Sequence, residues 1–448
     1  MNLVKRLGER GGIALALSLL SLLSPAARAQ EPSPVLTIQM ALRRALEANA
    51  STATARSQVA TSQAQVRQLK RSILPHVDLE SAVTRNSQEV AFDVNGFRAT
   101  ILPRNDWNAK LIFSQPIYAG ARELKALRQA RLGVTSAESG LRSTEDMVLL
   151  ATAANFLGIV QGQALADVEQ KNLELAGRRR KQAQAFYEAG EQTKVDVLRV
   201  ETDTKAAERA LAAAIQSRDL AASRLRLNLA LDQFSEAPLQ VAAPDLKFPP
   251  LPPAETLVAE AQANHPSVRQ ADLALQIAQL ETSKQQAARL PTVRAEGNIV
   301  DQRTSFPASQ TASLAIKLTM PIFDSGETSA KVAVAREHQR QAEIALAEAK
   351  RQVREDVLQA LLELRTAEKD VALAKEQLAA ADAEYAQSFE LYRAQEATSL
   401  DLQTSEAALA SSRRAVVNGT LNRDLAELNV WSAVGTLKNL ILTEESAK

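Results

Sequence analysis

Apolar and polar residues alternate with a period of two in four short segments, at about 76–86, 106–116, 292–302 and 311–321. In the first of these, Val77 and Leu79 alternate with Asp78 and Glu80. A period of two places apolar side chains on one face of a β-strand and polar side chains on the other. The pattern therefore predicts four two-faced strands, with one pair in each half of the chain.

A very long helix is predicted after each strand pair, because no proline interrupts residues 121–189 or 327–394. At 1.5 Å per residue each helix spans about 100 Å. The second carries an apolar seam that recurs about every 3.5 residues, the period of a coiled coil, at Val353, Val357, Leu361, Leu364, Ala367, Val371, Ala374, Leu378, Ala381, Tyr385, Phe389 and Tyr392. Partner helices at about 193–231 and 398–432 would complete two long hairpins.

Shorter helices are expected to begin at Thr37 and to occupy 51–72, 254–264 and 266–290. Proline lacks an amide hydrogen and restricts its neighbour, so Pro75 and Pro291 should end helices, and Pro116 and Pro321 should close strands. The polar connectors at 86–106 and 303–311 are expected to be loops. Five prolines between residues 244 and 253 predict a stiff, extended linker at 241–253.

The chain repeats itself at an offset of 205 residues. Pro116 recurs as Pro321, and the tetrad Tyr187, Thr193, Asp196 and Glu201 recurs as Tyr392, Thr398, Asp401 and Glu406. Identity kept at a matched spacing implies two structurally equivalent units. We place them at 30–240 and 254–448.

The first 29 residues have the pattern of a secretory signal peptide. A basic start is followed by an apolar run from Ile13 to Leu23 and by Ala27-Arg28-Ala29, a small-x-small cleavage site. An uncleaved anchor is the alternative. No later stretch reads as the roughly 18 apolar residues of a spanning helix, so any membrane contact is expected to use strands.

Composition narrows the possible functions. The chain has no cysteine, which excludes disulfides and thiolate metal sites, and its 53 basic and 52 acidic residues give no nucleic-acid footprint. The three histidines, His76, His265 and His338, lack ligand spacing, so no metal or cofactor is expected. No nucleophile–base set, phosphate loop or paired carboxylates indicate an enzyme.

The number of strands decides the architecture. A single strand pair is not stable alone in water, whereas strands of about 9–11 residues cross a bilayer. Four strands cannot close a barrel, and open edges are not tolerated in lipid. The chain is therefore expected to be mainly α-helical and to share a membrane β-barrel among copies. Three copies would give twelve strands and a twelve-helix periplasmic tube with room for a lumen.

The sequence resembles the outer-membrane efflux protein family, the TolC-like channels, over essentially the whole mature chain. The resemblance rests on the strand pairs, the two Pro-Ile-aromatic corners and the helix tips, which read FYEAGEQTKVDVL at 186–198 and LYRAQEATSLDL at 391–402. It implies a homotrimeric exit duct in the outer membrane, in contact with its lipid, for efflux or type I secretion. A periplasmic adaptor and an inner-membrane pump of the RND, ABC or MFS type would be its partners.

The resemblance also assigns residues. Asp401, with Thr404 one turn on, matches the periplasmic entrance ring, and Asp196 and Tyr392 match the links that hold the entrance closed. The adaptor-docking positions are Gly190, Thr193, Val195, Ala397, Thr398 and Leu400. Ala397 and Thr404 replace an arginine and an aspartate of the family pattern, and Gln395 replaces a glycine, which leaves open how the closed state is held.

The same residues also have purely structural interpretations. A threonine followed by an aspartate after a turn also caps a helix, Tyr187 and Tyr392 are also seam positions, and Arg178–Lys181 is interpreted as a solvated helix face. A periplasmic adaptor would also carry a long hairpin, but between compact β domains. A structural coiled-coil protein of the envelope would explain the heptads but not the strands.

Overall fold

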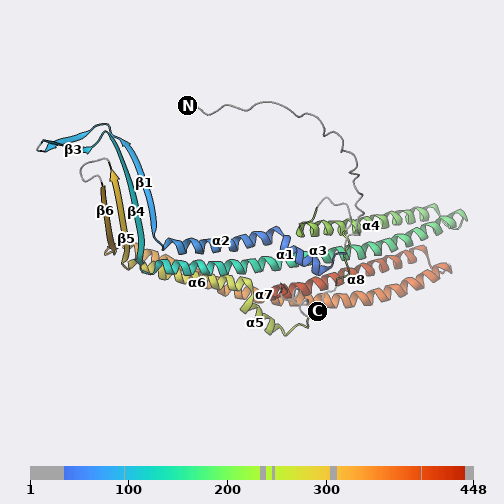
Figure 1. Cartoon of the computed structure of the whole chain (residues 1–448). Helices are drawn as coiled ribbons and strands as arrows, with labels where there is room; N and C mark the ends of the chain where they lie inside the picture. Colours follow the sequence, from blue (N-terminus) through green and yellow to red (C-terminus); the bar gives the residue numbers. More distant parts are fainter. Residues whose placement is uncertain are drawn as a thin grey trace, which may run out of the picture.

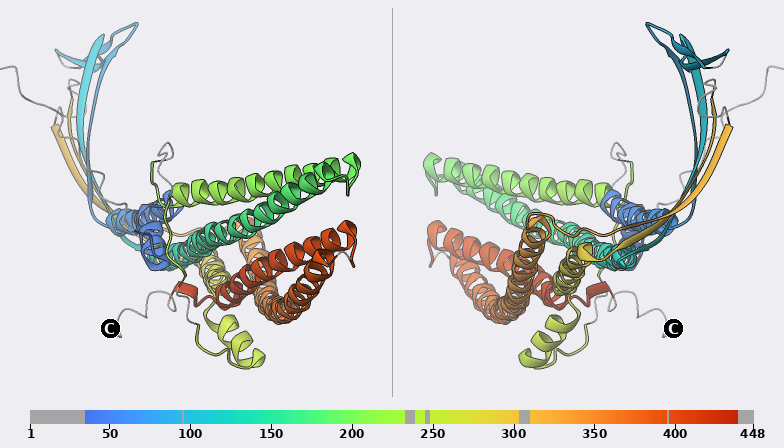
Figure 2. Two further views of the ribbon diagram at one scale, coloured as in Figure 1. Left: turned by 90° about the vertical axis from the view of Figure 1, so that its right-hand side faces the viewer. Right: turned by 90° about the vertical axis from the view of Figure 1, so that its left-hand side faces the viewer.

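The computed structural model describes residues 35–94, 96–232, 239–244, 248–302, 310–394 and 396–438. The fold is mainly helical, with a four-stranded sheet at one end and two helical hairpins reaching away from it (Figure 1). Viewed at right angles, the hairpins lie side by side and the strands rise from their shared base (Figure 2). The predicted signal peptide and Gln395 lie outside the described residues.

The sheet is antiparallel, in the order β1 (His76–Arg85), β4 (Asn105–Ala119), β5 (Thr292–Gln302), β6 (Gln310–Thr319). Its register aligns the apolar positions across all four strands, for example Leu79 opposite Leu111 and Leu111 opposite Ile299. Leu79 is 73% exposed and Ile299 57%. The two repeats thus combine their strand pairs into one sheet whose apolar face is not covered by any of the residues that the structure describes.

The connector after β1 is not a plain loop. It holds a second hairpin, β2 (Val90–Val94) with β3 (Phe97–Leu102). Residues 95 and 96 are Asn-Gly, the usual signal for a two-residue hairpin turn, and Gly96 has the positive φ of 86° that such a turn requires. The prediction of a loop here was wrong because the short apolar runs on either side of Asn-Gly pair with each other as strands.

Proline has different effects in the two repeats. The prediction that Pro116 closes its strand was wrong, since β4 continues to Ala119 after a register shift between Pro116 and Tyr118. An irregularity of this kind tolerates a residue without an amide hydrogen. In the second repeat β6 ends at Thr319, two residues before Pro321.

The corners from sheet to helix share one backbone geometry. Gly120 and Ala121 both have positive φ, and so do Ser325 and Gly326, their equivalents in the second repeat. A side chain at Gly120 would place its Cβ 2.8 Å from the Ala287 carbonyl oxygen. Two consecutive left-handed residues turn the chain from the sheet into the helices, and α3 (Arg122–Glu188) and α7 (Glu327–Arg393) start immediately after.

The long helix α7 packs through the apolar seam predicted from its sequence. Every seam position of α7 is buried or half-buried, and Val357 is fully buried. Glutamines on the outer faces donate to acidic residues one turn on, as Gln163 does to Asp167 and Gln352 to Asp356. Such pairs each stabilise a helix by a few tenths of a kcal/mol.

Shorter helices line the long ones end to end. Near the sheet, α2 (Ala50–Ser72) packs on α3 and α6 (Pro266–Gln286) packs on α7. Beyond them, α4 (Lys194–Asn228) pairs with α3, and α8 (Ser399–Val434) with α7. The main core lies where these helices meet, with α1 (Ile38–Ala48) and α5 (Ala254–Asn264) packed across them. Of the predicted linker, Phe248 and Leu251 pack against this core.

One described helix, α3, contains an 18-residue window with a mean hydropathy of 1.5, long and apolar enough to cross a membrane. The prediction that no such stretch follows the signal peptide was therefore wrong. The middle of α3 supplies Leu149, Phe156 and Leu157 to the main core, and each is at most 2% exposed. Its hydropathy is explained by burial against the neighbouring helices.

Gly162 permits the close approach of α3 and α4. A Cβ built there would lie 2.7 Å from the Cα of Arg218 on α4, whereas one built at Gly177, on the same helix, meets nothing within 4 Å. We expect Gly162→Ala to destabilise the fold by about 1–3 kcal/mol through overpacking. Gly177→Ala should stabilise it by about 0.5–1 kcal/mol through helix propensity. Unfolding midpoints of both variants would test this, and changes of the same sign would contradict it.

A buried carboxylate on α3 predicts a pH dependence. Burial raises the pKa of Asp146 to about 6, against the attraction of Lys438, whose backbone amide donates to it. The folded chain therefore holds a proton that the unfolded chain releases, and this stabilisation is lost as pH rises from about 4 to about 6. Asp146→Asn should raise the unfolding free energy by about 1–2 kcal/mol at pH 7.5. At pH 4 the gain should vanish in the same unfolding experiment, and an equal gain at both values would exclude Asp146 as its source.

Candidate functional site

The two hairpins end in nearly identical turns far from the sheet. After α3, the amide of Glu191 donates to the Phe186 carbonyl, and after α7 the amide of Glu396 donates to the Leu391 carbonyl. These six-to-one bonds are typical of a Schellman motif. Gly190 supplies the left-handed residue of the first turn, with φ of 80°, and a Cβ built there would meet nothing within 4 Å.

A capping box follows each turn. Thr193 accepts from the Asp196 amide while the Asp196 carboxylate accepts from the Thr193 amide, and Thr398 and Asp401 do the same on α8. These hydrogen bonds from threonine hold the pKa of both aspartates below the ordinary value. The capping interpretation is therefore confirmed for both pairs. Asp401 remains exposed and charged at the tip.

The expected link between Asp196 and Tyr392 is not formed within the chain. Tyr392 is 8% exposed and its hydroxyl accepts a hydrogen bond of 3.4 Å from Gln192, in the other hairpin's turn. Asp196 instead has Arg199 at 3.6 Å. Thr404 is exposed and donates to the Leu400 carbonyl.

The expected docking positions form an exposed rim at the tips. Val195 is 62% exposed and Leu400 59%, while Ala397 is half-buried. Apolar side chains exposed at the end of a capped helix have no role in the cap.

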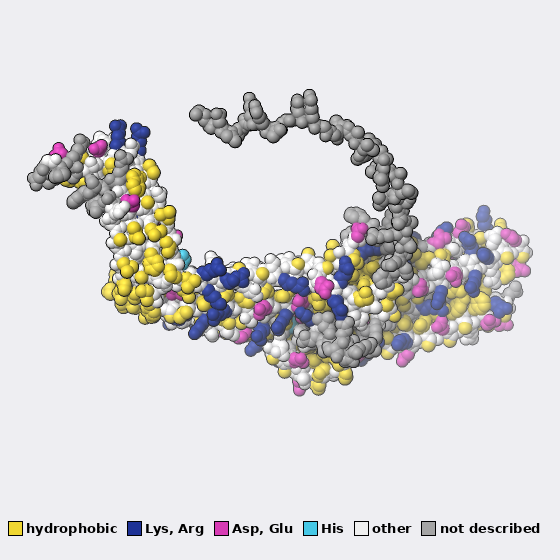
Figure 3. Space-filling view, viewed as in Figure 1, with side chains coloured by type: hydrophobic (Ala, Val, Ile, Leu, Met, Phe, Trp, Pro, Cys, Tyr) yellow, Lys and Arg dark blue, Asp and Glu magenta, His cyan; other side chains and the backbone are white. Residues whose placement is uncertain are grey.

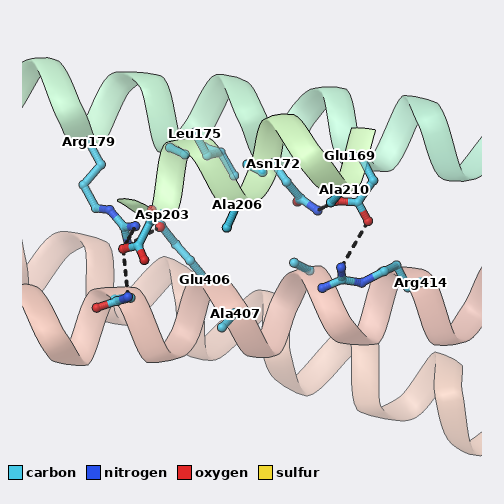
Figure 4. Close-up of a pocket in the computed structure, with 14 residues that line it drawn as sticks. Glu169, Asn172, Leu175, Arg179, Asp203, Ala206, Ala210, Glu406, Ala407 and Arg414 are labelled. Atoms are coloured by element: carbon cyan, nitrogen blue, oxygen red, sulfur yellow. Dashed lines mark hydrogen bonds and ion pairs between the residues drawn. The ribbon is translucent and has the colours of Figure 1, made fainter. Parts of the chain in front are cut away.

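Arg179 is the main polar link between the hairpins (Figure 4). Its guanidinium, on α3, lies 2.7 Å from Asp203 on α4 and 2.7 Å from Glu406 on α8, and its side chain is only 7% exposed. The interpretation of Arg178–Lys181 as a solvated face was wrong for Arg179. Burial raises the pKa of Glu406, and the positive charge of Arg179 opposes that shift.

More polar contacts extend this link along the hairpins. Gln403 donates to Asp203, and Arg414 on α8 lies 3.2 Å from Glu169 on α3. Alanines line the groove between them, among them Ala176, Ala206 and Ala407. We call the contacts through Arg179, Gln403 and Arg414 the polar ladder. Packing within each hairpin is largely apolar, whereas the ladder joins one hairpin to the other.

The sequence contained a signal for this role. Ala176 and Ala183 are buried on the same face of α3 as Arg179. A cation in phase with buried small residues, three or four positions away on each side, faces the helix interface. Its partners come from two other helices, so no spacing along the chain identifies them.

The chain is similar to known proteins over most of its length. The family model described as "Outer membrane efflux protein" matches residues 41–231 and 257–436. The chain is 24% identical over 335 residues to the outer membrane efflux protein BepC of Brucella suis, covering 72% of this chain and 71% of BepC.

Solved structures share the fold. The outer membrane channel CmeC of Campylobacter jejuni superposes with a TM-score of 0.78 at 16% identity, over 91% of this chain and 89% of CmeC. The open state of the MtrE outer membrane channel of Neisseria gonorrhoeae gives a TM-score of 0.73 at 19% identity, over 89% of this chain and 88% of MtrE.

Removing the Arg179 cation should loosen the contact between the hairpins. Arg179→Met leaves two partly buried carboxylates without their partner, which should cost about 1–3 kcal/mol. The matched control is Arg180→Met, because Arg180 is exposed and should change stability by less than about 0.5 kcal/mol. Thermal unfolding of the two variants would compare them, and equal midpoints would mean that the ladder does not stabilise the chain.

Proposed function

Because this chain belongs to the outer membrane efflux protein family, we propose that three copies form a passive exit duct through the outer membrane and the periplasm. The sheet is the observation that supports this proposal. One chain contributes four strands with an exposed apolar face. Lipid would cover that face, and neighbouring copies would pair with β1 and β6 to close a twelve-stranded barrel. The four helix columns of each chain would continue it as a twelve-helix tube.

The duct would act with an energised pump rather than by chemistry of its own. An inner-membrane pump of the RND, ABC or MFS type would supply energy for efflux or type I secretion. A periplasmic adaptor would dock on the exposed rim, where Val195 and Leu400 offer apolar contact. We assign no catalytic residue, since the groups at the tips are engaged in caps and ion pairs.

Closure of the entrance would depend on polar contacts. Asp401, with Thr404, would line the narrowest ring, and Asp196 and Tyr392 would contribute links between neighbouring coiled coils. The polar ladder supports the proposal that the hairpins can separate when the entrance opens. Its ion pairs and hydrogen bonds can be replaced by contacts with water in that motion. An apolar interface would instead expose apolar surface to water in the same motion, which costs free energy.

The assembly is tested first by light scattering of the detergent-extracted protein and by conductance in planar bilayers. We expect the mass of three chains and discrete channel openings. A monomer that conducts no ions would overturn the proposal.

The role of Asp401 can be separated from its cap. Asp401→Asn removes the charge but keeps an oxygen for the Thr398 amide, whereas Thr398→Ala breaks the capping box and keeps the charge. Three carboxylates in one ring attract divalent cations, so Asp401→Asn should weaken their block of the current by about tenfold or more. Thr398→Ala should leave block within about twofold. If the two variants lose block equally, Asp401 acts as a cap and not as the ring.

A further inference from the structure

The end of α2 carries an unusual concentration of positive charge. The helix has no acidic residue, and three of its cations, Arg67, Lys70 and Arg71, fall within its last six positions. All three are exposed, and none forms an ion pair with any residue that the structure describes. We call these three residues the basic belt.

The basic belt lies at the foot of the sheet. Gln115 of β4 donates to the Ile73 carbonyl over 3.0 Å, which fixes the end of α2 against the strands. The exposed Val77 follows the last belt residue by only six positions. Figure 3 shows dark blue side chains gathered beside the base of the apolar strands, over the adjoining helices.

The acidic residues Glu281, Asp78 and Glu80 form no ion pair with the belt among the residues that the structure describes. Glu281 on α6 is held by Lys284 and accepts from Gln129. On β1, Asp78 and Glu80 alternate with Val77 and Leu79, so they occupy the other face of the sheet. Arg122 and Arg128, both exposed on α3, add further positive charge near the same end.

We propose that the basic belt binds the headgroup phosphates of anionic phospholipids in the periplasmic leaflet. The proposal rests on the proposed function in one respect, namely that the strands cross the membrane. Lipid against the apolar face of the strands then brings its headgroups to the level where α2 ends and β1 begins. Guanidinium groups bind phosphate through two parallel hydrogen bonds, and exposed Lys70 can reach the same layer with its flexible stem.

Membrane electrostatics sets the size of the effect. Each cation close to an anionic surface contributes about a fivefold preference, within a distance of about one Debye length. Cations in the last turn of a helix also complement its macrodipole. That role changes helix stability but gives no selectivity among lipids, so lipid selectivity is the quantity to measure.

The test uses the full-length protein in nanodiscs that contain phosphatidylcholine and phosphatidylglycerol. Native mass spectrometry after gentle release counts the two lipids that remain bound. We expect the wild type to be enriched in phosphatidylglycerol about fivefold or more over the disc composition. The triple variant Arg67→Gln, Lys70→Gln, Arg71→Gln should fall to the disc composition, and 0.5 M salt should reduce the wild-type enrichment in the same direction.

The matched control removes the same charge at the far end of the helices. Arg180→Gln, Lys181→Gln, Lys194→Gln changes three exposed cations near the hairpin tips and should keep the wild-type enrichment. Enrichment that survives in the belt variant, or that is lost equally in the control, would overturn the proposal. Displacement of the lipid by 10 mM inorganic phosphate would also overturn it, since the belt would then be a site for free anions.

Conductance of the same preparations separates this proposal from the proposed function. The belt variant should form channels of wild-type conductance, because the belt lies outside the tips. A wild type that forms no channels but retains phosphatidylglycerol would contradict the duct and leave the lipid site standing. Channels without lipid enrichment would do the reverse.

Discussion

The rest of the structure depends on an apolar sheet that the described part of the chain leaves uncovered. Four strands align their apolar side chains in one register, and Leu79, Ile299 and Leu314 remain mostly exposed. Backbone groups along open strand edges need partners wherever water is absent. A single chain with this sheet is therefore an incomplete object in lipid. The left-handed corners turn the chain from the sheet into the long helices. All four strands therefore lie together at one end of the molecule.

Two kinds of packing then divide the helical part. Within a hairpin, small and aliphatic side chains meet along a seam, and Gly162 lets α3 and α4 approach until a single Cβ would collide. Between hairpins, in the part distant from the sheet, Arg179 and the other members of the polar ladder make the contact. Apolar seams hold the two helices of each hairpin together. Ion pairs can be replaced by water at a lower cost, so the opening motion that we propose would separate the hairpins at this boundary.

Duplication explains the shared backbone of the two repeats, and divergence in the first hairpin explains part of the links between the hairpins. Both repeats keep the corner with two left-handed residues, the Schellman turn and the capping box. The ladder does not follow the repeat. Arg179 has Glu384 as its equivalent, and the exposed Glu201 corresponds to the half-buried Glu406. The ladder residues of the first hairpin, Glu169, Arg179 and Asp203, differ from their equivalents, whereas Glu406 and Arg414 on α8 keep the residue types of Glu201 and Arg209. The ladder therefore joins diverged positions of the first hairpin to positions of α8, two of which are unchanged between the repeats.

The sequence by itself determined the elements, because period, proline and caps act over a few residues. The four alternating segments, the long proline-free helices and the Thr–Asp caps at the tips all depend on neighbours within one or two turns. The β2–β3 hairpin and the continuation of β4 past Pro116 were not predicted from the sequence, because short local signals compete in both segments. Only the tertiary structure decided that Arg179 is buried between Asp203 and Glu406, that Tyr392 meets Gln192, and that α2 ends with its cations at the foot of the sheet. These contacts join residues from different helices, so their existence depends on how long elements pack and not on any spacing along the chain.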